Sequence, residues 1–139
     1  RLVADHPLMV RTINADGTGV STGDVLVSSV TGGALTVTTA NAGATSTSQV
    51  IGVAMNAASG GTACNVAFVG IVQSTKADAS FVAATHLTKK VYLSKTGGTV
   101  SITPPSASGD TVFQVGICMG GSGTNWEVLL QPEFIMLID

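Results

Sequence analysis

The segment VYLSKTGGTVSITPP, residues 91–105, alternates apolar and polar side chains on both sides of a Gly-Gly pair. A period of two along the chain is typical of a β-strand with one buried face. Gly97 and Gly98 supply the positive backbone angles that a short hairpin turn needs. The segment therefore predicts a strand, a tight turn and a second strand that ends before Pro104.

A second hairpin of the same kind lies upstream, in VLVSSVTGGALTVTTA at residues 25–40. Each of the two hairpins is followed, after a polar spacer, by a further predicted hairpin, at residues 50–70 and 113–130. Aligned on their turns, these later hairpins match Gly52 with Gly116, Met55 with Met119, Cys64 with Trp126 and Val66 with Val128. The sequence therefore indicates an internal duplication.

The spacing of the predicted strands, roughly 8 to 12 residues from Gly23 onward, is expected of a β-sandwich or β-barrel. The connector at 74–90 is the segment in which a helix is expected, with Asp78 or Ser80 as its N-cap. The predicted fold is all-β: one small barrel or sandwich, built from two repeated hairpin pairs that pack face to face. The strands are expected near residues 25–30, 34–39, 50–57, 63–73, 90–94, 99–103, 112–119 and 125–131.

The two ends of the chain depart from this pattern. The first residues are expected to form an extended arm, with a short strand near 8–13, that either lies on a neighbouring subunit or frays. The run FIMLI near the C-terminus is too uniformly apolar to face water on either side, so it needs a cover, from its own barrel or from a neighbour. The predicted divisions are an arm at 1–22, a duplicated domain at 23–132 with units at about 23–73 and 89–132, and a C-terminal strand at 133–139.

Composition indicates a folded chain that buries surface against partners. Charged residues make up 10% of the 139 residues, against about a quarter in ordinary globular domains. Hydrophobic residues make up 45%, far more than a disordered chain carries. The net charge of −2 and the scattered lysines argue against a nucleic-acid partner. No apolar run reaches the length of about 18 residues that crosses a membrane, so no membrane partner is expected.

No set of side chains in the sequence predicts catalysis, a cofactor or a metal site. His6 and His86 have no carboxylate or Cys at ligand spacing and are expected to be surface residues. Cys64 and Cys118 lack CxxC spacing and are expected to be small buried side chains.

Three further polar or aromatic residues are given structural roles. Asp24 and Asp110 each follow a glycine and open a strand, where Asp commonly caps its own backbone; this is preferred to calcium binding. Trp126 is expected to fill the core with Val128 and Leu130 on the same face, with stacking on a sugar ring as the alternative.

Four stretches resemble a known class of proteins. They are GDVLVSS at 23–29, VIGVAMNAASGGTACNVAFVGIV at 50–72, KKVYLSKTGGTVSITPP at 89–105, and VFQVGICM with VLLQP at 112–119 and 128–132. In this order they are similar to the small β-domains of tailed-phage structural proteins, which are best known from head decoration (capsid cement) proteins and also occur in head and tail fibres. The resemblance covers about residues 23–132.

The resemblance implies a β-barrel or β-sandwich module without catalysis or cofactor, which binds the outer surface of a phage head and stabilises the shell. The implied partners are the major capsid protein and further copies of the chain in a homotrimer, and the implied location is the capsid surface of the virion. The alternative is a domain of a trimeric head or tail fibre or spike that takes part in host attachment. A small extracellular enzyme is a third reading.

The residues expected to make contacts lie at the two ends of the chain. The tail is the stronger candidate, because five consecutive apolar residues there need a partner. The candidates are Leu8, Met9, Val10 and Arg11 in the arm, and Phe134, Ile135, Met136, Leu137 and Ile138 in the tail.

Overall fold

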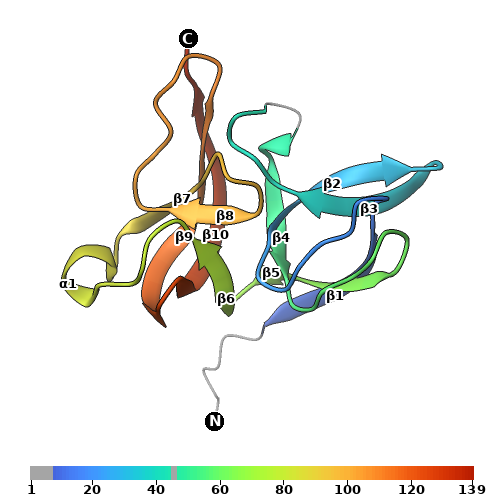
Figure 1. Cartoon of the computed structure of the whole chain (residues 1–139), viewed down its shortest axis with the longest axis horizontal. Coiled ribbons are helices and arrows are strands. Elements are labelled where there is room, and N and C mark those ends of the chain that lie inside the picture. The colour runs from blue at the N-terminus through green and yellow to red at the C-terminus, as the bar shows by residue number, and fades with distance from the viewer. Residues whose placement is uncertain (1–7, 45–46) are drawn as a thin grey trace.

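The computed structural model describes residues 8–44 and 47–139, and within them the chain is almost entirely β-structure, as predicted (Figure 1). One short helix, α1 (Ala83–His86), interrupts the strands. The strands are β1 (Met9–Ala15), β2 (Val25–Thr31), β3 (Ala34–Thr39), β4 (Val50–Ala54), β5 (Ala63–Val69), β6 (Ile71–Ala77), β7 (Lys90–Leu93), β8 (Thr99–Ser101), β9 (Thr111–Ser122) and β10 (Asn125–Leu137).

Each half of the chain closes a barrel of its own. Strands β1 to β5 hydrogen-bond in a ring in the order β1-β3-β2-β4-β5, and strands β6 to β10 form a ring in the corresponding order β6-β8-β7-β9-β10. In both rings the first strand pairs parallel with the third. The all-β class is therefore confirmed, but the described chain forms two small barrels in tandem, whereas one barrel closed by both halves was expected.

Gly52 and Gly116, which were matched in the sequence, occupy equivalent positions in the two barrels. A Cβ atom on Gly52 would lie 2.2 Å from the carbonyl oxygen of Ala67, and a Cβ on Gly116 would lie 2.0 Å from that of Leu129. Both distances are far below a van der Waals contact, so at each site the neighbouring strand passes too close for any side chain. The match of Gly52 with Gly116 is therefore confirmed in three dimensions.

Strand β1 belongs to the first barrel, so the prediction of a free arm at 1–22 is wrong over its described part. The strand runs antiparallel to β5 and parallel to β3. Its side chains Ile13 and Ala15 are buried inside the barrel, which supplies the driving force for this pairing. The first unit therefore begins with β1, not at residue 23.

The expected connector at 74–90 is in part a strand. The run 63–73 was predicted as one strand, but it divides at Gly70, whose φ of 112° turns the chain out of the first barrel and into β6. Helix α1 has no side-chain N-cap, so neither Asp78 nor Ser80 caps it. The second unit therefore begins with β6.

Strand β10 runs on through the residues predicted as a separate C-terminal strand. Beyond Pro132 it pairs with β9, with Phe134 opposite Phe113. The register shifts between Leu130 and Glu133 and again between Phe134 and Met136, and bulges of this kind let a proline sit inside a strand. Of the two readings left open for this segment, a strand added to its own barrel is confirmed, and Figure 1 shows it projecting from the second barrel toward the C-terminus.

Two clusters of buried side chains form the core. The smaller one fills the first barrel and includes Leu26, Val37 and Val66. The larger one fills the second barrel, around Trp126, and extends into the first barrel through Val25. The two barrels thus share part of one core.

Backbone hydrogen bonds also join the barrels. The N–H of Val25 donates to the carbonyl of Gly98 at 3.0 Å, and the N–H of Gly98 donates to the carbonyl of Ala40 at 2.8 Å. The N–H of Ala42 donates to the carbonyl of Ser94 at 3.1 Å. Because such bonds are directional, they hold the β7–β8 hairpin of the second barrel in register against the first.

Candidate interaction surfaces

A cluster of exposed apolar side chains surrounds the start of β1. Met9 is the cross-strand partner of Val69, and Ile71 follows Val69 across the turn at Gly70. The five side chains of the cluster are each 41% to 58% exposed. The exposed Arg11 follows Val10 in strand β1. We call this cluster the N-terminal patch; it consists of Leu8, Met9, Val10, Val69 and Ile71.

The second exposed apolar cluster is the end of β10. Four consecutive side chains there are each 41% to 50% exposed, so pairing with β9 covers them only in part. Ile138, the fifth predicted residue, is half-buried, and its N–H donates to the carbonyl of Asp110 at 2.9 Å. We call this cluster the C-terminal ribbon; it consists of Phe134, Ile135, Met136 and Leu137.

Charges of opposite sign accompany the two surfaces. Arg11 follows the N-terminal patch, whereas Glu133 and Asp139 flank the C-terminal ribbon, and all three side chains are exposed. Figure 1 shows the start of β1 and the end of β10 at opposite ends of the molecule. The predicted arm and tail candidates are therefore not brought together within one copy.

Sequence reasoning missed Val69 and Ile71. It assigned them to the middle of one strand, where an apolar run reads as core. Gly70, between them, was the available signal, since a glycine inside a strand pattern often marks a bend. The bend at Gly70 ends one barrel and begins the next, and both neighbours remain exposed there.

Asp24 and Asp110 cap equivalent turns, as predicted. Oδ2 of Asp24 accepts the N–H of Ser21 at 2.7 Å, and Oδ2 of Asp110 accepts the N–H of Ala107 at 3.1 Å. Both side chains are buried, so these bonds replace hydration that the carboxylates have lost.

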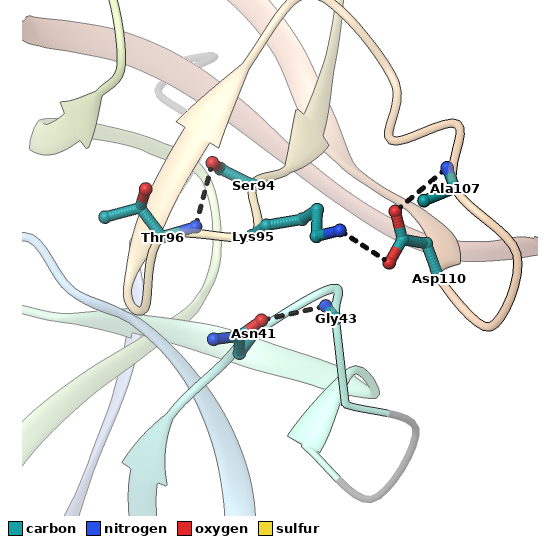
Figure 2. A network of polar contacts seen from close by, with 7 residues as sticks. All are labelled: Asn41, Gly43, Ser94, Lys95, Thr96, Ala107 and Asp110. Carbon is teal, nitrogen blue, oxygen red and sulfur yellow. Dashed lines mark hydrogen bonds and ion pairs between the residues drawn. The ribbon is translucent and has the colours of Figure 1, made fainter.

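The other oxygen of each buried carboxylate faces a lysine. Nζ of Lys95 lies 3.1 Å from Oδ1 of Asp110, close to the Asn41 loop of the first barrel (Figure 2). The ammonium of Lys76 in β6 contacts Oδ1 of Asp24, and this ion pair joins the two barrels. Both carboxylates are thus engaged in holding the fold together.

His86 is buried, so the prediction that it is a surface residue is wrong. Its ring centroid lies 4.7 Å from that of Trp126, and its Nδ1 accepts the N–H of Val82 at 2.7 Å. The imidazole therefore acts as a structural hydrogen-bond acceptor at α1. Trp126 is fully buried, as predicted, and its Nε1 donates to the carbonyl of Ala79 at 3.1 Å. His6 lies outside the described residues.

Cys64 and Cys118 are buried free thiols, as predicted. Burial raises the pKa of both thiols, and backbone hydrogen bonding at Asn56 and at Gly120 lowers it by a smaller amount. A thiol that stays protonated is a poor nucleophile, so the environment of neither cysteine activates it.

A surface hollow of about 450 Å³ lies beside the loop that follows β1. Its lining is mainly small and polar and includes Thr18, Ser21 and Asp24. Nearby, burial raises the pKa of Asp16, but the side-chain and backbone hydrogen bonds from Thr18 lower it, and the net result is a lowered pKa. The one carboxylate in the lining, that of Asp24, is already held by Ser21 and Lys76.

The described residues contain no group of three or more His, Cys, Asp or Glu side chains that is placed to hold a metal ion. In the same part of the chain, no helix has both the length and the hydrophobicity to span a membrane. The exposed apolar surfaces are therefore the features that most need a functional explanation.

Comparison with known proteins finds no match to the chain among family models, curated proteins or solved structures.

Proposed function

We propose that this chain is a structural protein of a tailed-phage particle, which binds the outer surface of the head in many copies and stabilises the shell. The observation that carries the proposal is the pair of apolar surfaces on opposite sides of one folded module, which gives each copy two places to contact its neighbours in an array on the shell. Surfaces of this kind on a small protein mark sites of contact with other macromolecules.

The arrangement of polar groups supports a role that depends on binding. Asp24 and Asp110 are tied to turns and lysines, and His86 is tied to α1. The Gly, Ser and Thr residues that dominate the sequence leave backbones close to the surface, which lets neighbouring molecules approach closely. A low surface charge keeps the desolvation cost of such contacts small.

The segments that carry the resemblance lie on strands of both barrels. VIGVA at 50–54 is β4, and the KVYL part of the third stretch, at 90–93, is β7. The resemblance therefore involves the barrel framework and leaves both apolar surfaces largely outside it. We infer that the framework is the shared part and that the two surfaces determine what this chain binds.

The test is electron cryomicroscopy of the phage particle that carries this chain, together with binding of the purified chain to emptied heads. We expect density at many equivalent positions over the shell and a higher temperature of head disruption after binding. Met136→Asp in the C-terminal ribbon should weaken binding to heads, whereas the matched control Val30→Asp, at an exposed site outside both surfaces, should bind like the wild type. Density confined to a tail or to a few vertices would contradict the proposal and favour the fibre domain.

A further inference from the structure

Within the part of the chain that the structure describes, the N-terminal patch and the C-terminal ribbon are two apolar surfaces of similar size that remain exposed. The five side chains of the patch and the four of the ribbon are each between 41% and 58% exposed. Because the two surfaces lie at opposite ends of the molecule, one copy cannot cover its own patch with its own ribbon.

Charge distinguishes the ways in which two copies can meet. An antiparallel contact between two ribbons, centred on Met136, sets Glu133 of one copy opposite Asp139 of the other, and like charges opposite one another are destabilising. A contact between two N-terminal patches brings the two Arg11 side chains toward each other. A contact between a patch and a ribbon pairs Arg11 with Glu133 or Asp139, and among the charged residues that the structure describes at these surfaces it is the arrangement that brings opposite charges together.

The backbone of β10 also disfavours pairing of two ribbons edge to edge. Pro132 has no N–H to donate, and the register of β10 shifts on both sides of Glu133. Prolines, bulges and charges are the features that keep a strand edge from adding another strand. The ribbon is therefore suited to docking through its side chains.

We propose that the C-terminal ribbon of one copy docks onto the N-terminal patch of a second copy of this chain. The contact is heterologous, so each copy uses its ribbon on one neighbour and its patch on another, and repetition builds a ring or a filament. This contact deepens the proposed function, because it names a second copy of the chain as the partner of each surface. It rests on that function only for the place of assembly, which is the phage head.

The size of the contact predicts its strength. At most five patch residues meet four ribbon residues, against about 20 to 30 residues on each side of a stable specific complex. A single contact is therefore weak, and two contacts per copy reinforce each other once a ring closes or many copies share a template. We expect the purified chain to associate at high concentration and to dissociate on dilution.

The experiment is sedimentation equilibrium of the full chain, without particles, from about 10 µM to about 1 mM. The variants are Met9→Asp in the patch and Met136→Asp in the ribbon, with Val30→Asp as the control; the native fluorescence of buried Trp126 checks folding. We expect the wild type and the control to increase in average mass with concentration, and each patch or ribbon variant to remain monomeric. An equimolar mixture of the two variants should form dimers and nothing larger, since one intact patch and one intact ribbon remain.

A second set of variants leaves every apolar side chain in place. Arg11→Glu alone, and Glu133→Lys with Asp139→Lys, should each weaken association at least about tenfold, because each places like charges in the contact. Mixing the two should restore association to within about threefold of the wild type. A wild type that stays monomeric at about 1 mM, self-association of Met9→Asp alone, or no restoration in the charge mixture would each overturn the proposal. Head binding is measured in a separate experiment, so a chain that fails to bind heads would not change the conclusion on self-association.

Discussion

Gly52 and Gly116 are the residues at which the duplication can be tested most directly. We predict that Gly52→Ala and Gly116→Ala each lower the free energy of unfolding by roughly 2 to 4 kcal/mol, because the new methyl group meets a backbone carbonyl that cannot move without breaking its strand. The measurement is urea unfolding followed by Trp126 fluorescence. Gly17→Ala is the control, since nothing lies within 4 Å of its Cβ position, and it should change stability by less than about 0.5 kcal/mol. Equal stability of all three variants would contradict the assigned strand packing.

The two buried cysteines give a prediction with a pH dependence. Burial raises the pKa of Cys64 and Cys118 above the ordinary value of 9.0, so both thiols should react with a disulfide reagent at pH 8 at least about a hundredfold more slowly than an exposed thiol. Met119→Cys, at an exposed neighbouring site, is the positive control.

The same shift predicts how stability depends on pH. A raised pKa means that the contribution of the thiol is complete below the pKa of the unfolded chain and is lost as the pH rises through the pKa of the folded chain. The loss should therefore begin near pH 9 and should be smaller in Cys118→Ala, whose equivalent in the first barrel is Ala54. In the labelling experiment at pH 8, a folded wild type that reacts with the disulfide reagent as fast as Met119→Cys would show that Cys64 and Cys118 are not buried.

At the scale of the element, the turn that opens β9 depends on one buried carboxylate. We predict that Asp110→Ala lowers the free energy of unfolding by about 2 to 4 kcal/mol, since it leaves the N–H of Ala107 without its acceptor and removes the ion pair with Lys95. Lys95→Ala should cost less, about 1 kcal/mol, because the ammonium is 54% exposed and the carboxylate keeps its backbone bond. Lys89→Ala, at an exposed site, is the control. Thermal unfolding at low and high salt measures the loss of stability in each variant. A larger loss in Lys95→Ala than in Asp110→Ala would contradict the prediction.

Most strands could be predicted from the sequence because alternation and Gly-Gly turns are local signals. The hairpins at 25–40 and 91–105 are β2–β3 and β7–β8, within a few residues at each end. A short strand near residues 8–13 was predicted and corresponds to β1, but its place in the first barrel was missed because its residues lack a turn signal of their own. The repeat did contain a signal, since MVRTINAD at 9–16 and IVQSTKAD at 71–78 share Val, Ala and Asp at matching positions.

Burial of polar side chains was harder to predict. A single histidine in a polar segment reads as exposed, and only the packing of α1 against Trp126 places His86 inside. The turns of Asp24 and Asp110 were predictable from the preceding glycines, but their lysine partners lie on other segments of the chain. Pairings between distant segments leave no pattern in a single sequence.

For the whole molecule, the shared core predicts cooperative unfolding. Side chains of the first barrel, such as Val25 and Val53, pack in the same cluster as Trp126 of the second. We therefore expect a single calorimetric transition, with equal calorimetric and van't Hoff enthalpies, for the dilute monomer. Fluorescence of Trp126 and circular dichroism should report the same midpoint. Two separated transitions would show that the barrels unfold independently.

The all-β class, the internal duplication, most strand positions and the two terminal contact candidates can be derived from local periodicity, turn chemistry and composition. The closure of each half into its own barrel, the membership of β1 and of the end of β10 in those barrels, and the position of the apolar surfaces on opposite sides become visible only in the folded molecule. These features depend on contacts between residues far apart in the chain, which form only when the whole core packs.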